Sequence, residues 1–275
     1  MKAVVAIAKH VSNADIDLPF ELLSHMRRAD DFIRLAVLSA FQAFDQRIEI
    51  PWESPERCGL ILGTSFGPMQ TNFDVLDLIV KGEQTSPTLF SHSVFNAAAG
   101  YLSRIFNLRG SALTLTDFAY PFFQALQQGC LAITSGQLER CLVLQVETYS
   151  ELLQDARVRI YHKEAAGWPA GSVCWLLERE GICTSGGCIV DLLTIEGEAV
   201  EGGAYLGCDG LLTQNGQNIP MSDPLGAAVA LTGIINKREN ASCYDCRLTS
   251  SYGAVELSLR IQKSATGLYR DTAGE

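Results

Sequence analysis

A short motif of glycine and serine is the first feature of this sequence that could carry chemistry. Residues 63–67 read Gly-Thr-Ser-Phe-Gly and follow the apolar run Cys58–Gly63. This spacing matches the G-x-S-x-G turn that presents a nucleophilic serine in α/β-hydrolases. Such a serine needs a late histidine base, yet the last histidine is His162, more than a hundred residues before the end. We therefore interpret the motif as a tight turn after a strand.

The cysteines and histidines are the next candidates, because both residue types bind metals. The sequence has nine cysteines, of which Cys183/Cys188 and Cys243/Cys246 are close pairs, and its four histidines lie elsewhere. A structural zinc site needs two well-spaced pairs of ligands, which these residues do not supply. Residues 1–10 lack the pattern of a secretion signal, so we expect the cysteines to stay reduced. We predict neither a metal site nor a cofactor.

Composition limits the classes of partner. The chain has 275 residues, 47% of them hydrophobic and 19% charged, which is enough to bury a sizeable core. The 21 basic and 31 acidic residues give a net charge of −10, which repels nucleic acid phosphates and anionic membranes. No apolar run approaches the roughly 20 residues that span a bilayer. We therefore expect a cytoplasmic protein that binds neither nucleic acid nor membrane.

The elements that must position any site alternate between strands and helices. The sequence predicts strands over 1–10, 58–63, 112–116, 141–146 and 172–178, and helices over 27–41, 72–80, 93–106 and 121–135. A shorter run follows, with a loop over 201–222, a helix over 223–236 and strands over 189–193 and 255–261. This alternation indicates a layered α/β protein.

A longer pattern extends from Pro87 to Gly110. It reads Pro-Thr-Leu-Phe-Ser-His-Ser-Val-Phe-Asn-Ala-Ala-Ala-Gly, followed by Phe-Asn-Leu-Arg-Gly at 106–110. The pattern resembles the β-ketoacyl synthase family, in which an Asn-x-x-Ala-Gly helix precedes a Gly-Leu-Arg-Gly-Pro turn. The resemblance covers roughly residues 1–180 and implies the thiolase fold, a layered α/β sandwich of two related halves that works as a dimer. We therefore predict a near-complete first half over 1–180 and a shortened second half over 181–275.

The resemblance also shows which catalytic groups have been replaced. The family's nucleophilic cysteine falls on Ala119, between the bulky side chains Phe118, Tyr120 and Phe122. A thiolate at a helix N-terminus can accept an acyl chain, whereas alanine cannot. Asp223 takes the place of one catalytic histidine, and its carboxylate would repel the charge that the histidine stabilises. The second histidine motif is absent, so we predict no catalytic residue.

Sequences of this family that lack the nucleophile resemble chain length factors. The resemblance implies a non-catalytic subunit that pairs with an active β-ketoacyl synthase in fatty-acid, polyene or polyketide synthesis, with acyl carrier protein as an indirect partner. A homodimer remains open for the chain alone. One alternative is a weak decarboxylase or acyltransferase that uses residual groups; the candidates are Asp117, Tyr120, His92 and Ser93. Another alternative is a scaffold unrelated to acyl chains.

The resemblance finally predicts how the subunit meets its partner. In this family the strand that falls on Ala112–Thr116 pairs with its counterpart across a two-fold axis, beside the helix that begins at Asn96. The segment before that helix lines the bottom of the partner's acyl tunnel. In this sequence it is a loop over Thr88–Ser93, in which Leu89 and Ser93 face the tunnel and Phe90 lies beside them.

Overall fold

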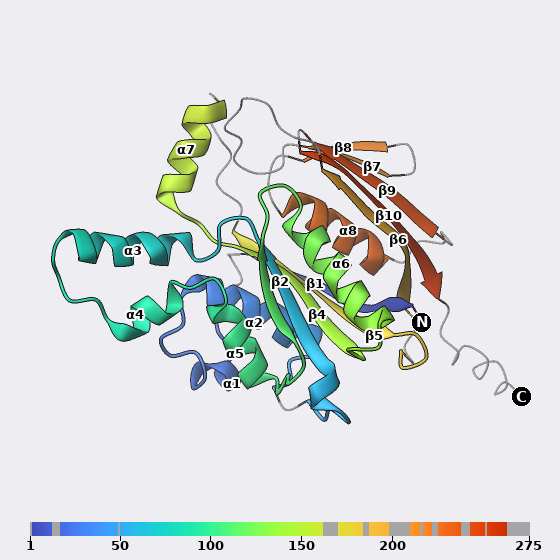
Figure 1. Cartoon of the computed structure of the whole chain (residues 1–275), viewed down its shortest axis with the longest axis horizontal. Coiled ribbons are helices and arrows are strands. Elements are labelled where there is room, and N and C mark those ends of the chain that lie inside the picture. Colours follow the sequence, from blue (N-terminus) through green and yellow to red (C-terminus); the bar gives the residue numbers. More distant parts are fainter. Residues whose placement is uncertain are drawn as a thin grey trace, which may run out of the picture.

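One ten-stranded sheet organises the computed structural model of the chain (Figure 1). The structure describes residues 2–12, 17–48, 50–161, 170–183, 187–197, 210–214, 217–221, 225–237, 243–250 and 252–262. The strands lie in the order β3-β2-β4-β5-β1-β6-β10-β9-β7-β8. Their bounds are β1 Ala3–Ser12, β2 Cys58–Thr64, β3 Ala112–Thr116, β4 Arg140–Glu147, β5 Gly171–Arg179, β6 Gly187–Gly197, β7 Gly210–Gln214, β8 Gln217–Met221, β9 Cys243–Ser250 and β10 Gly253–Gln262.

The described ranges contain eight α-helices. They are α1 Phe20–Leu23, α2 Asp31–Ala43, α3 Met69–Val80, α4 Pro87–His92, α5 Ala97–Ile105, α6 Pro121–Thr134, α7 Glu151–Tyr161 and α8 Gly226–Lys237. In the first part of the sheet, β2 pairs in parallel with β3 and β4, and β5 runs antiparallel between β4 and β1. Strand β2 is buried along its whole length, as expected for a strand that helices cover on both faces.

Helices α2 and α5 cover one face of this part of the sheet. The apolar face of α2, which includes Phe32, Leu35 and Phe41, packs with residues of α5 such as Leu102 and with strand residues such as Leu62. Each of these side chains is at most 2% exposed. Burying a side chain of this size contributes about 1.5–3 kcal/mol, so this cluster fixes the outer helical layer on the sheet.

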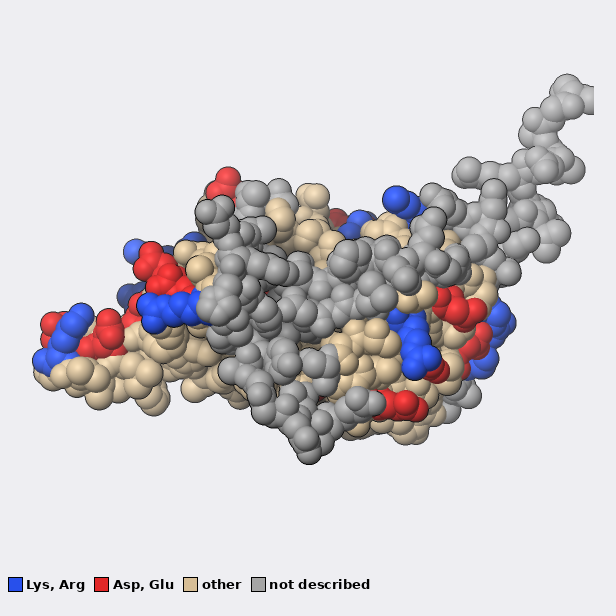
Figure 2. Space-filling model, turned by 90° about the horizontal axis from the view of Figure 1, so that it is seen from above, with Lys and Arg blue, Asp and Glu red and all other residues tan. Residues whose placement is uncertain are grey.

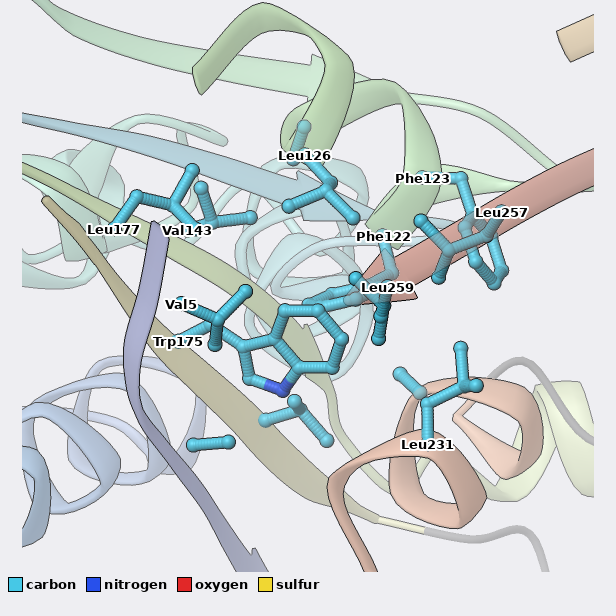
Figure 3. Packing of buried hydrophobic residues seen from close by; sticks show 14 of the residues in the cluster. Val5, Phe122, Phe123, Leu126, Val143, Trp175, Leu177, Leu231, Leu257 and Leu259 are labelled. Atoms are coloured by element: carbon cyan, nitrogen blue, oxygen red, sulfur yellow. The ribbon is translucent and has the colours of Figure 1, made fainter. Parts of the chain in front are cut away.

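Helices α6 and α8 lie between the two parts of the sheet (Figure 1). Figure 3 shows their common core, in which Phe122 and Leu126 of α6 and Leu231 of α8 meet Trp175 of β5 and Leu257 of β10. The Trp175 indole N–H donates to Thr232 Oγ1 at 2.8 Å, so the one polar atom of this ring is satisfied. The observed order of layers confirms the layered α/β fold.

The second part of the sheet has an apolar inner face and a polar outer face. Along β10, Val255, Leu257 and Leu259 point into the core, and the residues between them point outward. Outer ion pairs cross between strands: Arg247 of β9 with Glu256 of β10 at 3.4 Å, and Arg260 of β10 with Asp191 of β6 at 2.6 Å. This alternation is typical of a sheet with one face in water.

Several predicted boundaries were wrong for local reasons. The helix predicted to begin at residue 27 begins at Asp31, because the Asp30 carboxylate accepts the Ile33 N–H at 3.0 Å and caps it. The loop predicted over 201–222 contains the hairpin β7–β8, and β9 was not predicted at all. Backbone pairing stabilises such polar strands without an apolar signal in the sequence. The division of the chain at residue 180 stays a prediction.

Candidate functional site

The sheet places the N-terminus of α6 at the carboxyl end of β2. Gly63 of β2 lies so close to the carbonyl of Pro121 that an added Cβ would overlap it, which explains why this position needs glycine. Pro121 is the first residue of α6, where its missing N–H costs nothing. Ala119 therefore sits at a buried helix start, 6% exposed, where the sequence predicts the lost nucleophile.

Two backbone donors just before α6 are already occupied. The Asp117 carboxylate oxygen Oδ1 accepts the N–H of Ala119 at 2.7 Å and the N–H of Tyr120 at 2.8 Å. Free N–H groups at a helix N-terminus are what stabilise an oxyanion in acyl transfer. Here a carboxylate takes that place, so these two donors are occupied and the local charge opposes a second anion.

Tyr120 closes the space beside Ala119. Its hydroxyl donates to the carbonyl of Gly253 at 2.6 Å and lies 2.6 Å from Oγ of Ser250, so it ties the start of α6 to the β9–β10 turn. Tyr120 is 3% exposed. The Tyr120 side chain is therefore buried and fixed in place next to Ala119 in the chain.

The neighbouring aromatic residues divide between core and surface. Phe122 packs edge-on against Trp175, with ring centroids 4.8 Å apart, and belongs to the core between the sheets. Phe118 is 56% exposed, and its ring lies 5.5 Å from that of buried Phe66. Of the two, only Phe118 is available to a partner.

A buried carboxyl group lies at the carboxyl ends of β2 and β4. Glu147 accepts the Ser65 N–H at 2.7 Å and the Gln145 amide at 3.1 Å on Oε1, and the Thr64 hydroxyl at 3.4 Å on Oε2. Burial raises the pKa of Glu147 from 4.5 to about 7, because these hydrogen bonds only partly offset the desolvation of the charged form. Glu147 thus holds the turn that carries Phe66. Ser65 of the G-x-S-x-G motif belongs to this buried network.

The residual polar candidates make structural contacts. His92 is buried, and its Nε2 lies 3.1 Å from the Tyr101 hydroxyl. The Ser93 hydroxyl donates to the carbonyl of Phe90 at 2.8 Å, and Asn96 is exposed at the start of α5 without a side-chain capping bond. None of these contacts joins them to Asp117. Asp223 lies outside the described residues.

The segment that leads to α5 was predicted as a loop, and this was wrong. Residues Pro87–His92 form α4, which Pro87 favours at its first position, and Ser93 ends it. The helix predicted over 93–106 correspondingly begins only at Ala97. Within α4, Leu89 is half-buried and Phe90 is exposed.

An exposed apolar surface, formed by Leu113, Phe118 and Phe95, lies next to the buried start of α6. Strand β3 is at the end of the sheet order, with Leu113 exposed. Phe118 follows β3 in the chain. Phe95 packs so closely against Gly67 that an added Cβ there would overlap its ring. An unpaired edge strand beside exposed aromatic rings is typical of a surface that another chain covers.

Sequence reasoning missed two features. Glu147 ends a strand that is mostly apolar and almost wholly buried, and a carboxylate at such a position is the signal that could have identified it. The exposed apolar residues of α3 also went unnoticed, because the spacing that predicts an amphipathic helix does not show which side is covered. Among the described residues, no group of three His, Cys, Asp or Glu side chains could hold a metal ion. Within these residues, no helix is long and apolar enough to cross a membrane.

Several solved structures with the same fold contain a ketosynthase together with a chain length factor or an acyl carrier protein. One, described as a ketosynthase in complex with its chain length factor from Xenorhabdus doucetiae, is 14% identical, with a TM-score of 0.58, over 94% of this chain and 99% of that chain. Another, a type II PKS acyl-carrier protein in complex with its ketosynthase bound to the hexaketide, is 13% identical, with a TM-score of 0.66 and the same coverage. The ishigamide ketosynthase/chain length factor is 15% identical, with a TM-score of 0.57, over 72% of this chain and 68% of that chain.

These likenesses establish the thiolase-like fold, in a chain that is shorter than a full ketosynthase. A comparison with curated protein sequences gives no match. The model of the N-terminal domain of β-ketoacyl synthases matches residues 11–167, which is more than half of the chain. That span contains the helix start at Ala119 and the strand edge at β3. The chain therefore belongs to the β-ketoacyl synthase family, through its N-terminal domain.

Proposed function

We propose that this chain is a non-catalytic subunit of the chain-length-factor type, which pairs with a β-ketoacyl synthase that carries the catalytic cysteine. The observation that carries the proposal is the start of α6, where Ala119 offers no nucleophile and Asp117 occupies its N–H at 2.7 Å. A condensing enzyme needs a thiolate to hold the acyl chain and free donors for the oxyanion. This helix start supplies no thiolate, and Asp117 occupies the N–H groups of Ala119 and Tyr120.

The alternative of a weak decarboxylase or acyltransferase has less support. His92 is buried against Tyr101, and the Ser93 hydroxyl bonds to the carbonyl of Phe90. A general base must reach the proton that it removes, either directly or through one water. Tyr120 is itself bonded to Gly253. These groups make structural hydrogen bonds and do not converge on one reacting position.

The role as a partner subunit rests on the open apolar surface. Strand β3 offers an unpaired edge, and Leu113, Phe95 and Phe118 are exposed next to it. Stable heterodimers of this kind bury roughly 2,000 Å² or more. Two of the similar solved structures are described as a ketosynthase with a chain length factor, which agrees with this pairing. The substrates would then be acyl chains of fatty-acid or polyketide type, carried to the pair by an acyl carrier protein.

Within this pair, α4 would limit the length of the product. Leu89 is half-buried and Ser93 follows it by one helical turn, with Phe90 exposed beside them. A growing chain gains about 0.8 kcal/mol for each buried CH₂ only while apolar space remains, and overpacking against a side chain then costs roughly 1–3 kcal/mol. In the intact complex we therefore expect longer products from Leu89→Ala and shorter ones from Leu89→Trp. Unchanged products from both variants would leave Leu89 a structural role only.

The pairing itself is tested by co-expression with a ketosynthase from the same genome that retains its cysteine. We expect one complex in size-exclusion chromatography, which the substitution Phe118→Asp breaks. Incubation of the chain alone with acyl- and malonyl-loaded carrier protein should give no β-ketoacyl product in mass spectrometry. A covalent acyl adduct on this chain, or a monomer that ignores the ketosynthase, would contradict the proposal.

A further inference from the structure

A cavity of about 300 Å³ lies at the opposite end of the sheet from the start of α6. Arg140 at the beginning of β4 and Glu178 near the end of β5 both line it. Ala119, in contrast, lies beyond the carboxyl end of β2, which runs parallel with β4 (Figure 1). Strand β4 has eight residues and therefore extends over roughly 25 Å. The cavity is thus separate from the helix start and from the exposed surface around Phe118.

Aromatic contacts fix the apolar wall of this cavity. The rings of Phe44 and Trp52 meet edge to face, with centroids 5.4 Å apart. The Trp52 indole N–H donates to the carbonyl of Phe106 at 2.7 Å. Leu176 of β5 continues the same wall. Because these contacts hold the indole in place before any ligand arrives, binding requires little rearrangement of the wall.

Arg140 and Glu178 neutralise each other within the cavity. Arg140 Nε donates to Glu178 Oε1 at 2.9 Å, and the two side chains are only 21% and 13% exposed. The guanidinium also lies 5.6 Å from the centroid of the Trp52 ring, an arrangement in which the ring attracts a cation. The pair therefore adds no net charge to the cavity.

Three exposed charged side chains at the cavity have no such partner. They belong to Asp45, Arg47 and Glu53, and none of the three forms an ion pair or a side-chain hydrogen bond with another described residue. Two carboxylates and one guanidinium leave an excess of one negative charge. On the face seen in Figure 2, by comparison, acidic and basic side chains lie side by side at both ends of the molecule. The local charge of the cavity thus favours a positive ligand.

The backbone at Asp45 supports a role for its carboxylate. Asp45 and Gln46 have φ angles of 52° and 61°, directly after α2, where glycine is the usual residue. The Gln46 N–H closes this turn by donating to the carbonyl of Phe41 at 2.9 Å. Left-handed residues other than glycine cost stability and occur preferentially at functional sites. The chain therefore keeps a carboxylate beside the cavity at a position where glycine would suit the backbone better.

We propose that this cavity, which Trp52 and Asp45 both line, binds a small organic cation with an aromatic or apolar body. The body packs against Phe44, Trp52 and Leu176, where apolar area is removed from water. The ammonium group lies at the carboxylates of Asp45 and Glu53, which accept charge-assisted hydrogen bonds. This site goes beyond the proposed function, because neither pairing nor acyl transfer uses this end of the sheet.

Titration with tryptamine in an isothermal calorimeter tests the proposal. Indole-3-acetate carries the same ring with the opposite charge and should bind about tenfold more weakly. Asp45→Asn and Glu53→Gln should each raise the Kd for tryptamine about fivefold. A protein of net charge −10 attracts any cation, so the matched control is Asp155→Asn, which removes the same charge from an exposed position on α7. The control should leave the Kd unchanged.

Asp45→Gly separates a binding role from a structural one. Glycine adopts the left-handed conformation without strain, so this variant should unfold at a higher urea concentration than the unchanged protein. It should nevertheless lose affinity for tryptamine by the same factor as Asp45→Asn. A carboxylate that served the fold alone would not give these opposite changes.

Three outcomes would overturn the proposal. Absence of binding at millimolar tryptamine would exclude the site itself. Equal affinity for tryptamine and indole-3-acetate would show that the carboxylates do not select the ligand. An equal loss of affinity in Asp155→Asn and Asp45→Asn would assign the binding to the overall charge of the protein. None of these measurements involves a ketosynthase, so each outcome leaves the proposed function untouched.

Discussion

The start of α6 and the surface around β3 lie close together but have opposite character. At the helix start, the N–H groups of Ala119 and Tyr120 are bound by Asp117, and the Tyr120 hydroxyl is bound by Gly253. Around β3, the backbone edge and the ring of Phe118 are exposed. At the start of α6, these polar groups are satisfied by hydrogen bonds within the chain. Around β3, apolar side chains are exposed to solvent.

Under the proposed function, this difference means that the fold can lose its catalytic role and keep its pairing role. Catalysis needs free donors and a nucleophile at one helix terminus, so a few substitutions there are enough to remove it. Pairing needs a large apolar surface, which depends on the whole arrangement of β3, α4 and α5. Here the surface persists while the helix start has become part of the protein's own packing.

The largest expected effect is on stability and comes from Glu147, which accepts the N–H of Ser65 in the turn that carries Phe66. Its pKa is raised from 4.5 to about 7, so the folded state binds more protons than the unfolded state between these values. Stability therefore falls as pH rises from about 4.5 to about 7, by about 3 kcal/mol in total. Glu147→Gln should remove this dependence and stabilise the protein at pH 8.

Urea unfolding at pH 5 and at pH 8 measures this effect. The control is Glu151→Gln, which changes an exposed carboxylate at the start of α7 and should keep the slope of the unchanged protein. An equal loss of stability in Glu147→Gln and the unchanged protein over this range would show that Glu147 does not lose its charge on folding.

Tyr120→Phe should lower the free energy of unfolding by a smaller amount, through the contacts of the start of α6 alone. The substitution removes the bond to the carbonyl of Gly253 and the contact with Ser250, both at 2.6 Å. A buried acceptor left without its partner costs about 1–3 kcal/mol. Tyr149→Phe, at an exposed tyrosine, should leave the free energy of unfolding unchanged. If the two variants have the same urea midpoint of unfolding, then the hydrogen bonds of Tyr120 to the β9–β10 turn do not stabilise the fold.

The sequence predicts the first part of the fold better than the second. Strand β3 lies where its alternating residues predict it, and α6 begins at Pro121 as predicted, because alternation and proline leave clear signals. The hairpin β7–β8 has no such signal, since its stability comes from pairing with β9. At the site, the sequence predicts that Ala119 stands in the place of the nucleophile, whereas the bond from its N–H to Asp117 depends on the fold.

Ala119→Cys should have the smallest effect, because we expect a thiol alone not to give acyl transfer at this position. The new side chain would stand beside the Asp117 carboxylate, which binds the local N–H groups. A nearby negative charge disfavours the thiolate, which is the reactive form. We therefore expect no acyl adduct by mass spectrometry and slow alkylation by iodoacetamide. In Ala119→Cys/Asp117→Asn the neutral amide still accepts the N–H bonds, and alkylation should be faster. Equal rates in the two variants would show that Asp117 does not suppress the chemistry, and acylation of the single variant would show that the helix start remains an acyl site.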